Sequence, residues 1–563
     1  MKPHDRFFES YYRLRPVNAT FTGVHSHDDR LPDWSPDGLG HAADEMRARR
    51  SALIAQRANA SASRGSVIAS MKNDQAVRDR ELAISFLDVQ LAEDESTHFH
   101  RGNPSLAIGE AAFGAISLIT RPFVRPSERV EPLVGRLEAV PTFLAGAQQS
   151  MRGRIPEPWR LKALRECEGA DILFRDGIRR WASANGVEPA AGARLDRAAA
   201  TARRGLDSFR SWLAGRANSN AESSAVRCDC GAELFGRLLE RGHWCTRSMA
   251  DLAAEAATSL DEALATLHER ARRIAPGGWP EVQERLAGVH PTTSDYLVTF
   301  QRVWDACRDI SERNDLVTWP DAPIRYVPIP PHTRDAAPYL YYLFYRSPAP
   351  FDPLPVHDYV VTPIEADMPA DEQLRRLRAT NASVIKLNHV VHHGAIGHHV
   401  QNHHAYAGAS DIGRVAAVDC ANRIGMFLGG TMAEGWACYA TDLMDEVGFL
   451  TPEESLSQQH TRARLLARAV VDLGLHGGSL TFDDAVAIYR DKVGFSHDAA
   501  AAETCKNSMF PATALMYWLG TDALHRLRHE RERSDGAAFS LKRFHDRVLS
   551  FGSIPVPLLS ELW

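Results

Sequence analysis

A run of histidines in the second half of the chain offers the residue type best suited to metal chemistry. Seven of the 24 histidines lie within the seventeen positions from 388 to 404: His389, His392, His393, His398, His399, His403 and His404. A neutral imidazole is the commonest protein ligand of divalent metals, and several imidazoles on one short segment can converge at little cost. The run therefore predicts a metal site.

The spacing within this run limits which imidazoles can share a metal. On a straight helix, with about 100° between residues, His399 and His403 point to one face, whereas His392 and His398 point about 120° apart. The second pair can converge only if the helix bulges or breaks at the glycines between them, at positions 394 and 397. The sequence leaves both pairs open, and with them the choice between His398 and His399 as a ligand.

A third ligand is needed, and Glu434 is the candidate. It begins the apolar segment Glu-Gly-Trp-Ala-Cys-Tyr-Ala at residues 434–440. A carboxylate on an apolar helix face is costly to bury unless it is paired, protonated or bound to a cation. A glutamate in the first turn of a helix is also common, because it interacts favourably with the helix dipole. Spacing alone leaves both interpretations open.

Most of the surrounding sequence predicts helix. Segments 40–60, 76–91, 194–214 and 249–274 place apolar residues three and four positions apart, and cap-like starts lie at 258–261 and 481–484. The exception is roughly 324–363, where proline-rich and aromatic stretches around Tyr326, Tyr339 to Tyr345 and Tyr359 predict short strands. The expected fold class is mainly α, with a small β-sheet.

Length permits one large helical unit over residues 1–563 or two parts. A glycine- and proline-containing break at residues 277–291 suggests a possible subdivision into an N-terminal helical half, 1–285, and a C-terminal half with the histidine run, 286–563. Both organisations agree with the sequence.

Composition limits the classes of function. With 44% hydrophobic and 24% charged residues the chain is typical of a globular protein, and its net charge of -6 offers no general attraction to nucleic acid or anionic lipid. Charges scattered through the first thirty residues argue against a signal peptide, and the apolar windows are too short to cross a bilayer. We therefore expect a cytoplasmic protein with a small peptide or small molecule as its partner, without nucleic acid or membrane; the sequence does not set its oligomeric state.

The histidine run and the Glu434 segment together resemble a bacterial family known as domain of unknown function 885. Its members carry His-Glu-x-x-Pro-Gly-His-His-x-Gln, followed by Glu-Gly-Trp-Ala-x-Tyr-Ala. This chain has His-His-Gly-Ala-Ile-Gly-His-His-Val-Gln at residues 392–401 and the second motif at residues 434–440. Similar segments at residues 16–25, 471–476 and 511–520 extend the resemblance over the whole chain.

The resemblance implies a large helical body with a central cleft, similar to helical metallocarboxypeptidases that carry a His-Glu-x-x-His helix, and an activity of zinc-peptidase type. Carried over position by position, it implies that His392, His398 and Glu434 are metal ligands, with zinc as the expected metal. It also implies that His476 and Tyr517 contact the substrate or the transition state.

This sequence departs from the family pattern at several polar positions. His393 replaces the family's glutamate, the expected general base. The other replacements are Ile396 for proline, Lys506 and Asn507 for arginine and tyrosine, Thr513 for glutamine and Trp518 for lysine. An imidazole can accept a proton near neutral pH, although a nearby dication disfavours its protonated form. Loss of cationic groups also weakens the case for a peptide carboxylate as the recognised group.

Three functions remain open from the sequence. The first is a divalent-metal hydrolase of zinc-peptidase type that acts on an amide of a peptide or small metabolite, with His393 or His399 relaying protons. The second is a metal enzyme of another class, because a histidine-rich site also suits iron, copper or manganese. The third is an inactive relative that keeps the cleft for binding.

Overall fold

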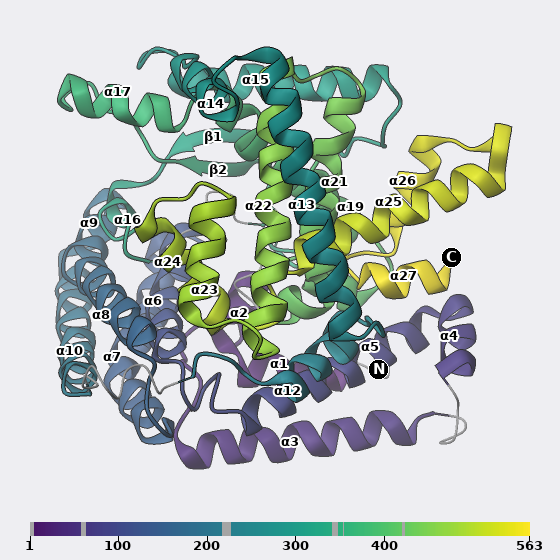
Figure 1. Ribbon diagram of the computed structural model, residues 1–563. Helices are drawn as coiled ribbons and strands as arrows, with labels where there is room; N and C mark the ends of the chain where they lie inside the picture. The colour runs from purple at the N-terminus through teal and green to yellow at the C-terminus, as the bar shows by residue number, and fades with distance from the viewer. Residues whose placement is uncertain (1–4, 58–63, 217–226, 341–346, 353, 419–422) are drawn as a thin grey trace.

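The computed structural model describes residues 5–57, 64–216, 227–340, 347–352, 354–418 and 423–563. Helices dominate these residues, and the one sheet among them has two strands (Figure 1). The expected fold class, mainly α with a small β-sheet, is confirmed.

The N-terminal helices cross the lower part of the molecule in the view of Figure 1. They are α1 (Asp5–Leu14), α2 (Pro16–Thr22), α3 (Pro36–Ala55), α4 (Arg64–Asn73) and α5 (Gln75–Glu95). The predicted helix at 76–91 lies within α5, which begins where the Asp74 side chain accepts hydrogen bonds from the backbone N–H groups of Ala76 and Val77. The predicted helix at 40–60 corresponds to α3, and its last residues lie outside the described part of the chain.

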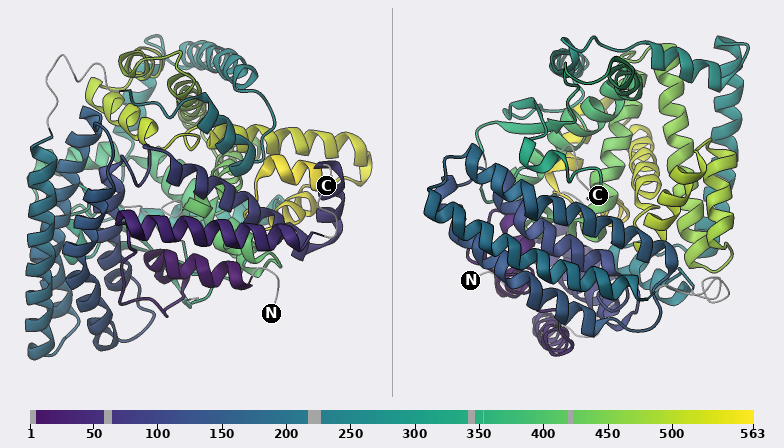
Figure 2. Two further views of the ribbon diagram at one scale, coloured as in Figure 1. Left: turned by 90° about the horizontal axis from the view of Figure 1, so that it is seen from below. Right: turned by 90° about the vertical axis from the view of Figure 1, so that its left-hand side faces the viewer.

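A helical bundle forms one side of the molecule, as the three views in Figures 1 and 2 agree. It consists of α6 (Pro104–Thr120), α7 (Pro126–Ser150), α8 (Glu157–Ile172), η1 (Leu173–Gly177), α9 (Ile178–Ala184) and α10 (Pro189–Ala214). Helix α7 packs between α6 and α10, and the bundle has its own apolar core. The helix predicted at 194–214 is the main part of α10.

The next elements include the first helix of one of two pairs of long helices. They are α12 (Ala232–Arg237), η2 (Leu238–Gly242), α13 (Met249–Ile274), α14 (Trp279–Gly288) and α15 (Tyr296–Arg313). Helix α13 has the predicted bounds and packs along α22 (Pro452–His476). The helix start expected at 258–261 is wrong, because α13 runs through it and the Thr258 hydroxyl donates back to the carbonyl of Ala254 at 3.0 Å.

The two predicted strand regions around Tyr326 and Tyr359 pair in parallel. Strand β1 (Ile324–Pro328) is followed by α16 (Pro331–Arg334), and β2 (His357–Val361) by α17 (Ala370–Ala379). Tyr326 lies opposite Tyr359 in the register. The third predicted strand segment, from Tyr339, falls largely outside the described residues.

The remaining helices surround the histidine run. Before α22 come α18 (Ala382–Val384), η3 (Ile385–Gly394), α19 (His398–Ala407), α20 (Asp411–Ala416), η4 (Gly425–Gly429) and α21 (Gly430–Glu446). After it come α23 (Phe482–Ala487), η5 (Ile488–Lys492), α24 (His497–Met509), α25 (Met516–Asp535), η6 (Gly536–Ala538), α26 (Leu541–Ser550) and α27 (Val556–Leu562). Thr481 caps α23 with a reciprocal capping box, as its sequence predicts.

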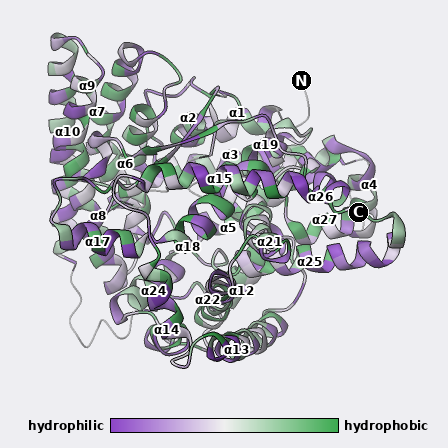
Figure 3. Ribbon diagram, turned by 90° about the horizontal axis from the view of Figure 1, so that it is seen from above, coloured by the Kyte–Doolittle hydropathy of each residue, from purple (hydrophilic) through white to green (hydrophobic). Residues whose placement is uncertain are grey.

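The largest apolar core joins both ends of the chain. Phe7, Phe86, Trp436 and Val556 belong to it together, so it crosses the possible boundary between residues 285 and 286. The subdivision into two halves stays a prediction. Peripheral helices carry both hydrophilic and hydrophobic residues (Figure 3). In the described part of the chain, none of the helices combines the length and apolar character that a membrane span requires.

Candidate metal centre

The histidine run does not form one continuous helix. Residues 385–394 form the π-helix η3, whose hydrogen bonds join residues five apart, and α19 begins only at His398. Between them, Ala395 (φ −128°, ψ −120°) and Gly397 (φ −71°, ψ −121°) leave helical geometry. This is the helix break that would let His392 and His398 converge.

Two glycines make the break possible. A Cβ atom at Gly397 would lie 1.9 Å from the carbonyl oxygen of His392, and one at Gly394 would lie 2.3 Å from the hydroxyl of Tyr326. Contacts this short do not occur between a real Cβ and its neighbours, so a side chain at Gly397 would displace the backbone, and one at Gly394 would displace the Tyr326 side chain. The backbone can fold back on itself here because these residues have no side chain.

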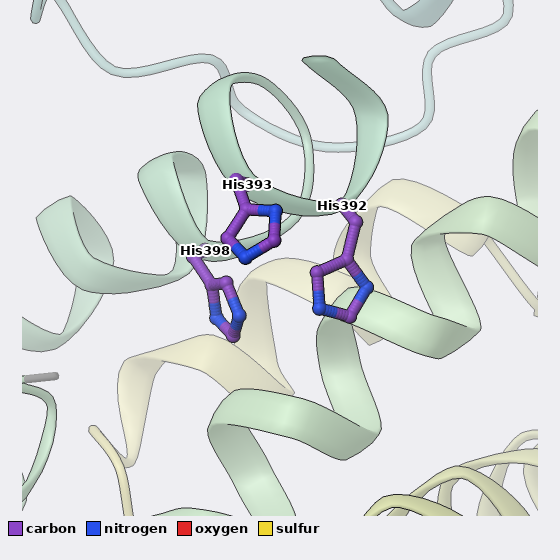
Figure 4. Close-up of side chains that lie close together, drawn as sticks. All are labelled: His392, His393 and His398. Atoms are coloured by element: carbon purple, nitrogen blue, oxygen red, sulfur yellow. The ribbon is translucent and has the colours of Figure 1, made fainter. Parts of the chain in front are cut away.

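Three imidazoles converge at the break. One ring nitrogen from each of His392, His393 and His398 lies within 4.8 Å of the other two. The ring centroids are 4.7 Å apart for His392 and His393, 4.9 Å for His392 and His398, and 5.3 Å for His393 and His398. Figure 4 shows the three rings gathered around one space, two from the end of η3 and one from the start of α19.

Glu434 completes the cluster from α21. Its Oε2 atom lies 3.4 Å from Nε2 of His392 and 3.5 Å from Nε2 of His398. Glu434 is the fifth residue of α21 and does not lie in its first turn, so the structure does not support the interpretation as a first-turn glutamate.

The distances from Glu434 Oε2 to the two imidazole nitrogens fit ligands of one divalent cation. Ligand atoms about 2.0–2.1 Å from a tetrahedrally coordinated ion lie about 3.4 Å from one another. Glu434 Oε2 is buried and has no hydrogen-bond partner of normal geometry. A buried carboxylate oxygen without a partner is costly, and a cation shared with the two imidazoles would satisfy it.

Backbone and indole groups hold the cluster in place. His393 donates its Nδ1–H to the carbonyl of Asn388 at 2.6 Å, which leaves Nε2 with its lone pair. The carbonyls exposed by the break are also satisfied: Trp304 Nε1–H donates to Gly394, and Trp436 Nε1–H donates to Ile396, each at 2.8 Å.

The electrostatics favour cation binding. Burial lowers the pKa of His392, and burial together with the charges of His392 and His398 lowers the pKa of His393 well below its ordinary value. For Glu434, burial raises the pKa, but the charge of His398 and the interaction with His392 outweigh it and hold the pKa well below 4.5. A neutral imidazole beside an ionised carboxylate is the combination of protonation states that a metal requires.

Two adjoining cavities surround the site. The histidine chamber, about 920 Å³, is lined by the four cluster residues and by Arg464. The large chamber, about 1210 Å³, lies next to it. Arg468, Lys506 and Tyr517 line both chambers and therefore lie where the two meet.

Comparison with known proteins shows the family. The model of a bacterial family of proteins of unknown function, DUF885, matches residues 16–562. The chain belongs to the DUF885 family. A search of curated proteins found no significant match to this DUF885 protein.

Two solved structures share the fold. A "putative lipoprotein of unknown function" from Shewanella oneidensis superposes with a TM-score of 0.77 at 20% identity, covering 100% of this chain and 98% of its own. A "putative lipoprotein" from Colwellia psychrerythraea superposes with a TM-score of 0.74 at 16% identity, covering 98% of this chain and 96% of its own. At these identities the similarity shows the fold alone.

Of the neighbouring residues His398 and His399, only His398 lies in the cluster of this DUF885 protein. His399 lies outside the cluster: its Nε2 hydrogen bonds to the carbonyl of Ala322 at 2.8 Å, and its ring packs 4.7 Å from that of His403. The pair expected on one face of a straight helix therefore exists, but it lies apart from Glu434. The geometry favours His398 as the ligand.

The two residues expected to contact substrate have different surroundings. His476 is fully buried and lines neither chamber. Its Nδ1 accepts the backbone N–H of Cys230 at 3.1 Å, and its Nε2–H donates to the carbonyl of Asn507 at 3.2 Å. Tyr517 does line both chambers, with the Arg468 guanidinium 5.2 Å from its ring centroid. Tyr517 therefore lies in the wall where the two chambers meet, and His476 lies in the core.

Positions that depart from the DUF885 motifs also lie near the chambers. Lys506, Asn507 and Thr513 line the large chamber, whereas Ile396 is buried at the helix break and Trp518 belongs to an apolar core. Arg464 and Trp304 are polar groups of the site that the sequence motifs did not indicate. Both lie on helices whose amphipathic pattern gives no sign of a buried polar contact.

Proposed function

We propose that this protein is a divalent-metal hydrolase that cleaves an amide bond in a peptide or small metabolite. His392, His398 and Glu434 would hold the metal. The observation that carries the proposal is the buried Glu434 Oε2, which lies 3.4 and 3.5 Å from two imidazole nitrogens without a hydrogen bond of normal geometry, beside a chamber of substrate size. Zinc is the expected metal, because catalytic zinc sites use three nitrogen and oxygen ligands and keep a fourth position open.

A bound divalent cation would polarise the amide carbonyl and lower the pKa of a water molecule at the site. His393 is the proposed general base, in the position where the family motif has glutamate. Its Nε2 lone pair is available because Nδ1–H is held by Asn388. His393 takes a proton from the attacking water as the oxygen bonds to the carbonyl carbon, and returns it to the departing amine nitrogen as the C–N bond breaks. Tyr517, in the chamber wall, is the proposed contact with the substrate.

A second candidate function follows from the third imidazole. The ring nitrogens of His392, His393 and His398 lie within 4.8 Å of one another, so His393 can serve as a ligand instead of a base. A site of three imidazoles and one carboxylate suits iron, copper or manganese. The protein would then be a metal enzyme other than a peptidase.

Metal content tests the site itself. We would measure bound metal by plasma mass spectrometry in wild type, His392→Ala and Glu434→Ala, with His404→Ala as the matched control. His404 lies on α19 beyond the cluster, where its Nε2 hydrogen bonds to the Thr318 carbonyl. We expect near-stoichiometric metal in wild type and the control and loss in the other two. Folded wild type that takes up no zinc, iron or manganese would overturn the proposal and favour a binding protein.

Replacement of His393 separates the two enzymatic candidates. If His393 is the base, His393→Gln keeps the metal and lowers amide hydrolysis by about 10²–10⁴-fold, and His393→Glu, which restores the family residue, retains activity. If His393 is a ligand, His393→Gln loses metal. Zinc-loaded protein that cleaves nothing in a broad panel of amides would exclude the hydrolase.

Location and partners remain predictions. The cytoplasmic location and the small peptide or small-molecule substrate are expectations from the sequence alone. The description as lipoprotein belongs to the two solved relatives, whose identity to this chain is 20% and 16%.

A further inference from the structure

The histidine chamber contains an arginine, Arg464, that forms no ion pair with the described residues. Arg464, on α22, lines the chamber, and its buried Nε atom has no hydrogen-bond partner. No carboxylate among the described residues forms an ion pair with it. Glu503 is near enough to act on the charge of Arg464 but does not form an ion pair with it. A buried guanidinium nitrogen without a hydrogen-bond partner is unfavourable, because burial disfavours the charged form.

The two carboxylates of this chamber and Arg468 are already engaged. Of its two carboxylates, Glu284 pairs with Arg378, and Glu434 lies beside the imidazoles. Arg468, one helical turn after Arg464, forms an ion pair with Glu503 at 2.5 Å. The wall that α22 presents to the chamber therefore carries an excess of positive charge.

Arg464 also lies close to the proposed reaction centre. Arg464 and the four cluster residues line the same chamber. Burial and the neighbouring charge of Arg468 lower the pKa of Arg464 itself. An anion bound at Arg464 would relieve this effect, and it would lie in the same chamber as the bond to be cleaved.

We propose that Arg464 binds a free carboxylate of the substrate, with Arg468 adding charge beside it. This inference rests on the proposed hydrolase and names its substrate class: an amide whose amine part carries a carboxylate, as in an N-acyl amino acid or the C-terminal residue of a peptide. A guanidinium suits this task because its planar N–H groups match the two oxygens of a carboxylate.

The large chamber accommodates the acyl part. Its wall includes the apolar side chains of Phe21, Leu31, Met46, Phe113 and Leu340. A substrate whose carboxylate lies at Arg464 and whose amide lies at the histidine cluster extends past Tyr517, where the two chambers meet. The acyl group is therefore expected to be apolar and longer than acetyl, since each buried methylene adds to the affinity.

Binding to metal-free protein tests the carboxylate site independently of turnover. By isothermal titration calorimetry we would compare N-octanoyl-L-alanine with its carboxamide, N-octanoyl-L-alaninamide, and with N-acetyl-L-alanine. Wild type should prefer the carboxylate over the carboxamide by about 10- to 100-fold, as expected for a charge-assisted hydrogen bond. It should prefer octanoyl over acetyl by at least about tenfold.

Two variants test whether Arg464 causes the preference for the carboxylate. Arg464→Gln should abolish the carboxylate preference, and Arg464→Lys should keep part of it. Arg302→Gln is the control, because Arg302 is an exposed arginine on α15 that lines neither chamber. Circular dichroism and melting temperature would confirm that each variant folds, and the wild-type comparison depends on no variant.

The outcomes separate this site from the proposed function. Equal binding of carboxylate and carboxamide by wild type, binding of neither, or an undiminished preference in Arg464→Gln overturns the carboxylate site. Carboxylate-selective binding without hydrolysis by metal-loaded enzyme supports the site and overturns the hydrolase. Equal hydrolysis of the carboxylate and the carboxamide supports the hydrolase and overturns the carboxylate site.

Discussion

Substituting Gly397 by alanine tests whether the break in the histidine run creates the metal site. The added Cβ would lie 1.9 Å from the carbonyl oxygen of His392 and 2.7 Å from that of Val391. To bring the added Cβ to an ordinary contact distance of about 3.5 Å from this oxygen, the backbone must shift by about 1.5 Å. Metal–ligand distances tolerate only about 0.2 Å, so the shift would remove His398 from a shared site with His392.

We expect Gly397→Ala to lower metal affinity by at least about 100-fold and to cost about 1–3 kcal/mol of unfolding free energy. Affinity would be measured by competition with a chromogenic chelator, and stability by urea unfolding. Gly192→Ala is the matched control, because a Cβ there meets nothing within 4 Å, and it should leave metal affinity unchanged. Wild-type metal affinity in folded Gly397→Ala would refute the reasoning that the tight turn positions His398.

Three further predictions concern groups outside the cluster. Arg136 is 1% exposed and donates to backbone carbonyls of three separate segments. Arg136→Met should therefore lower the unfolding free energy by about 3–5 kcal/mol. A loss below about 1 kcal/mol in urea unfolding would contradict this. His476→Ala leaves the half-buried Cys230 N–H and the buried Asn507 carbonyl without their partner, so we expect about 2–4 kcal/mol of destabilisation with KM unchanged. A higher KM at wild-type stability would instead indicate substrate contact. Burial raises the pKa of Glu110 from 4.5 to about 7, so the folded state binds the proton more tightly and wild type should lose about 1–3 kcal/mol between pH 4.5 and 7. Glu110→Gln should lack that loss of stability. If the melting temperatures of wild type and Glu110→Gln change in parallel with pH, the predicted role of Glu110 is wrong.

Periodicity predicted much of the fold because most helices here are amphipathic. The apolar spacing from Met249 gave both ends of α13. The same reasoning misplaced a start at Thr258, because a threonine inside a helix and a threonine at its cap differ only in which backbone group the hydroxyl contacts. Parallel pairing of β1 with β2 joins residues 33 positions apart, such as Tyr326 and Tyr359, and local patterns do not encode it.

The site was predictable in its residue types but not in its geometry. The sequence reduced the candidate ligands to His392, His398 or His399, and Glu434, and it required a helix break for His398. The choice depended on backbone angles at residues 395–397, which follow from packing against Tyr326 and the indole groups and not from spacing. Arg464 was missed because an arginine on an amphipathic helix usually faces solvent.

The second motif, on α21, connects Glu434 to the helix break between His392 and His398. Glu434 and Trp436 are two residues apart on α21: the first reaches the imidazoles, and the second donates Nε1–H to the Ile396 carbonyl within the break. One helix therefore fixes the distance between the carboxylate and the folded-back segment that carries His392 and His398. A protein that used this space only for binding would gain nothing from a buried carboxylate oxygen without a partner, whose burial destabilises the fold. A cation that Glu434 shares with two imidazoles accounts for that cost and for the broken helix together, which is why metal content is the measurement on which the proposed function depends most.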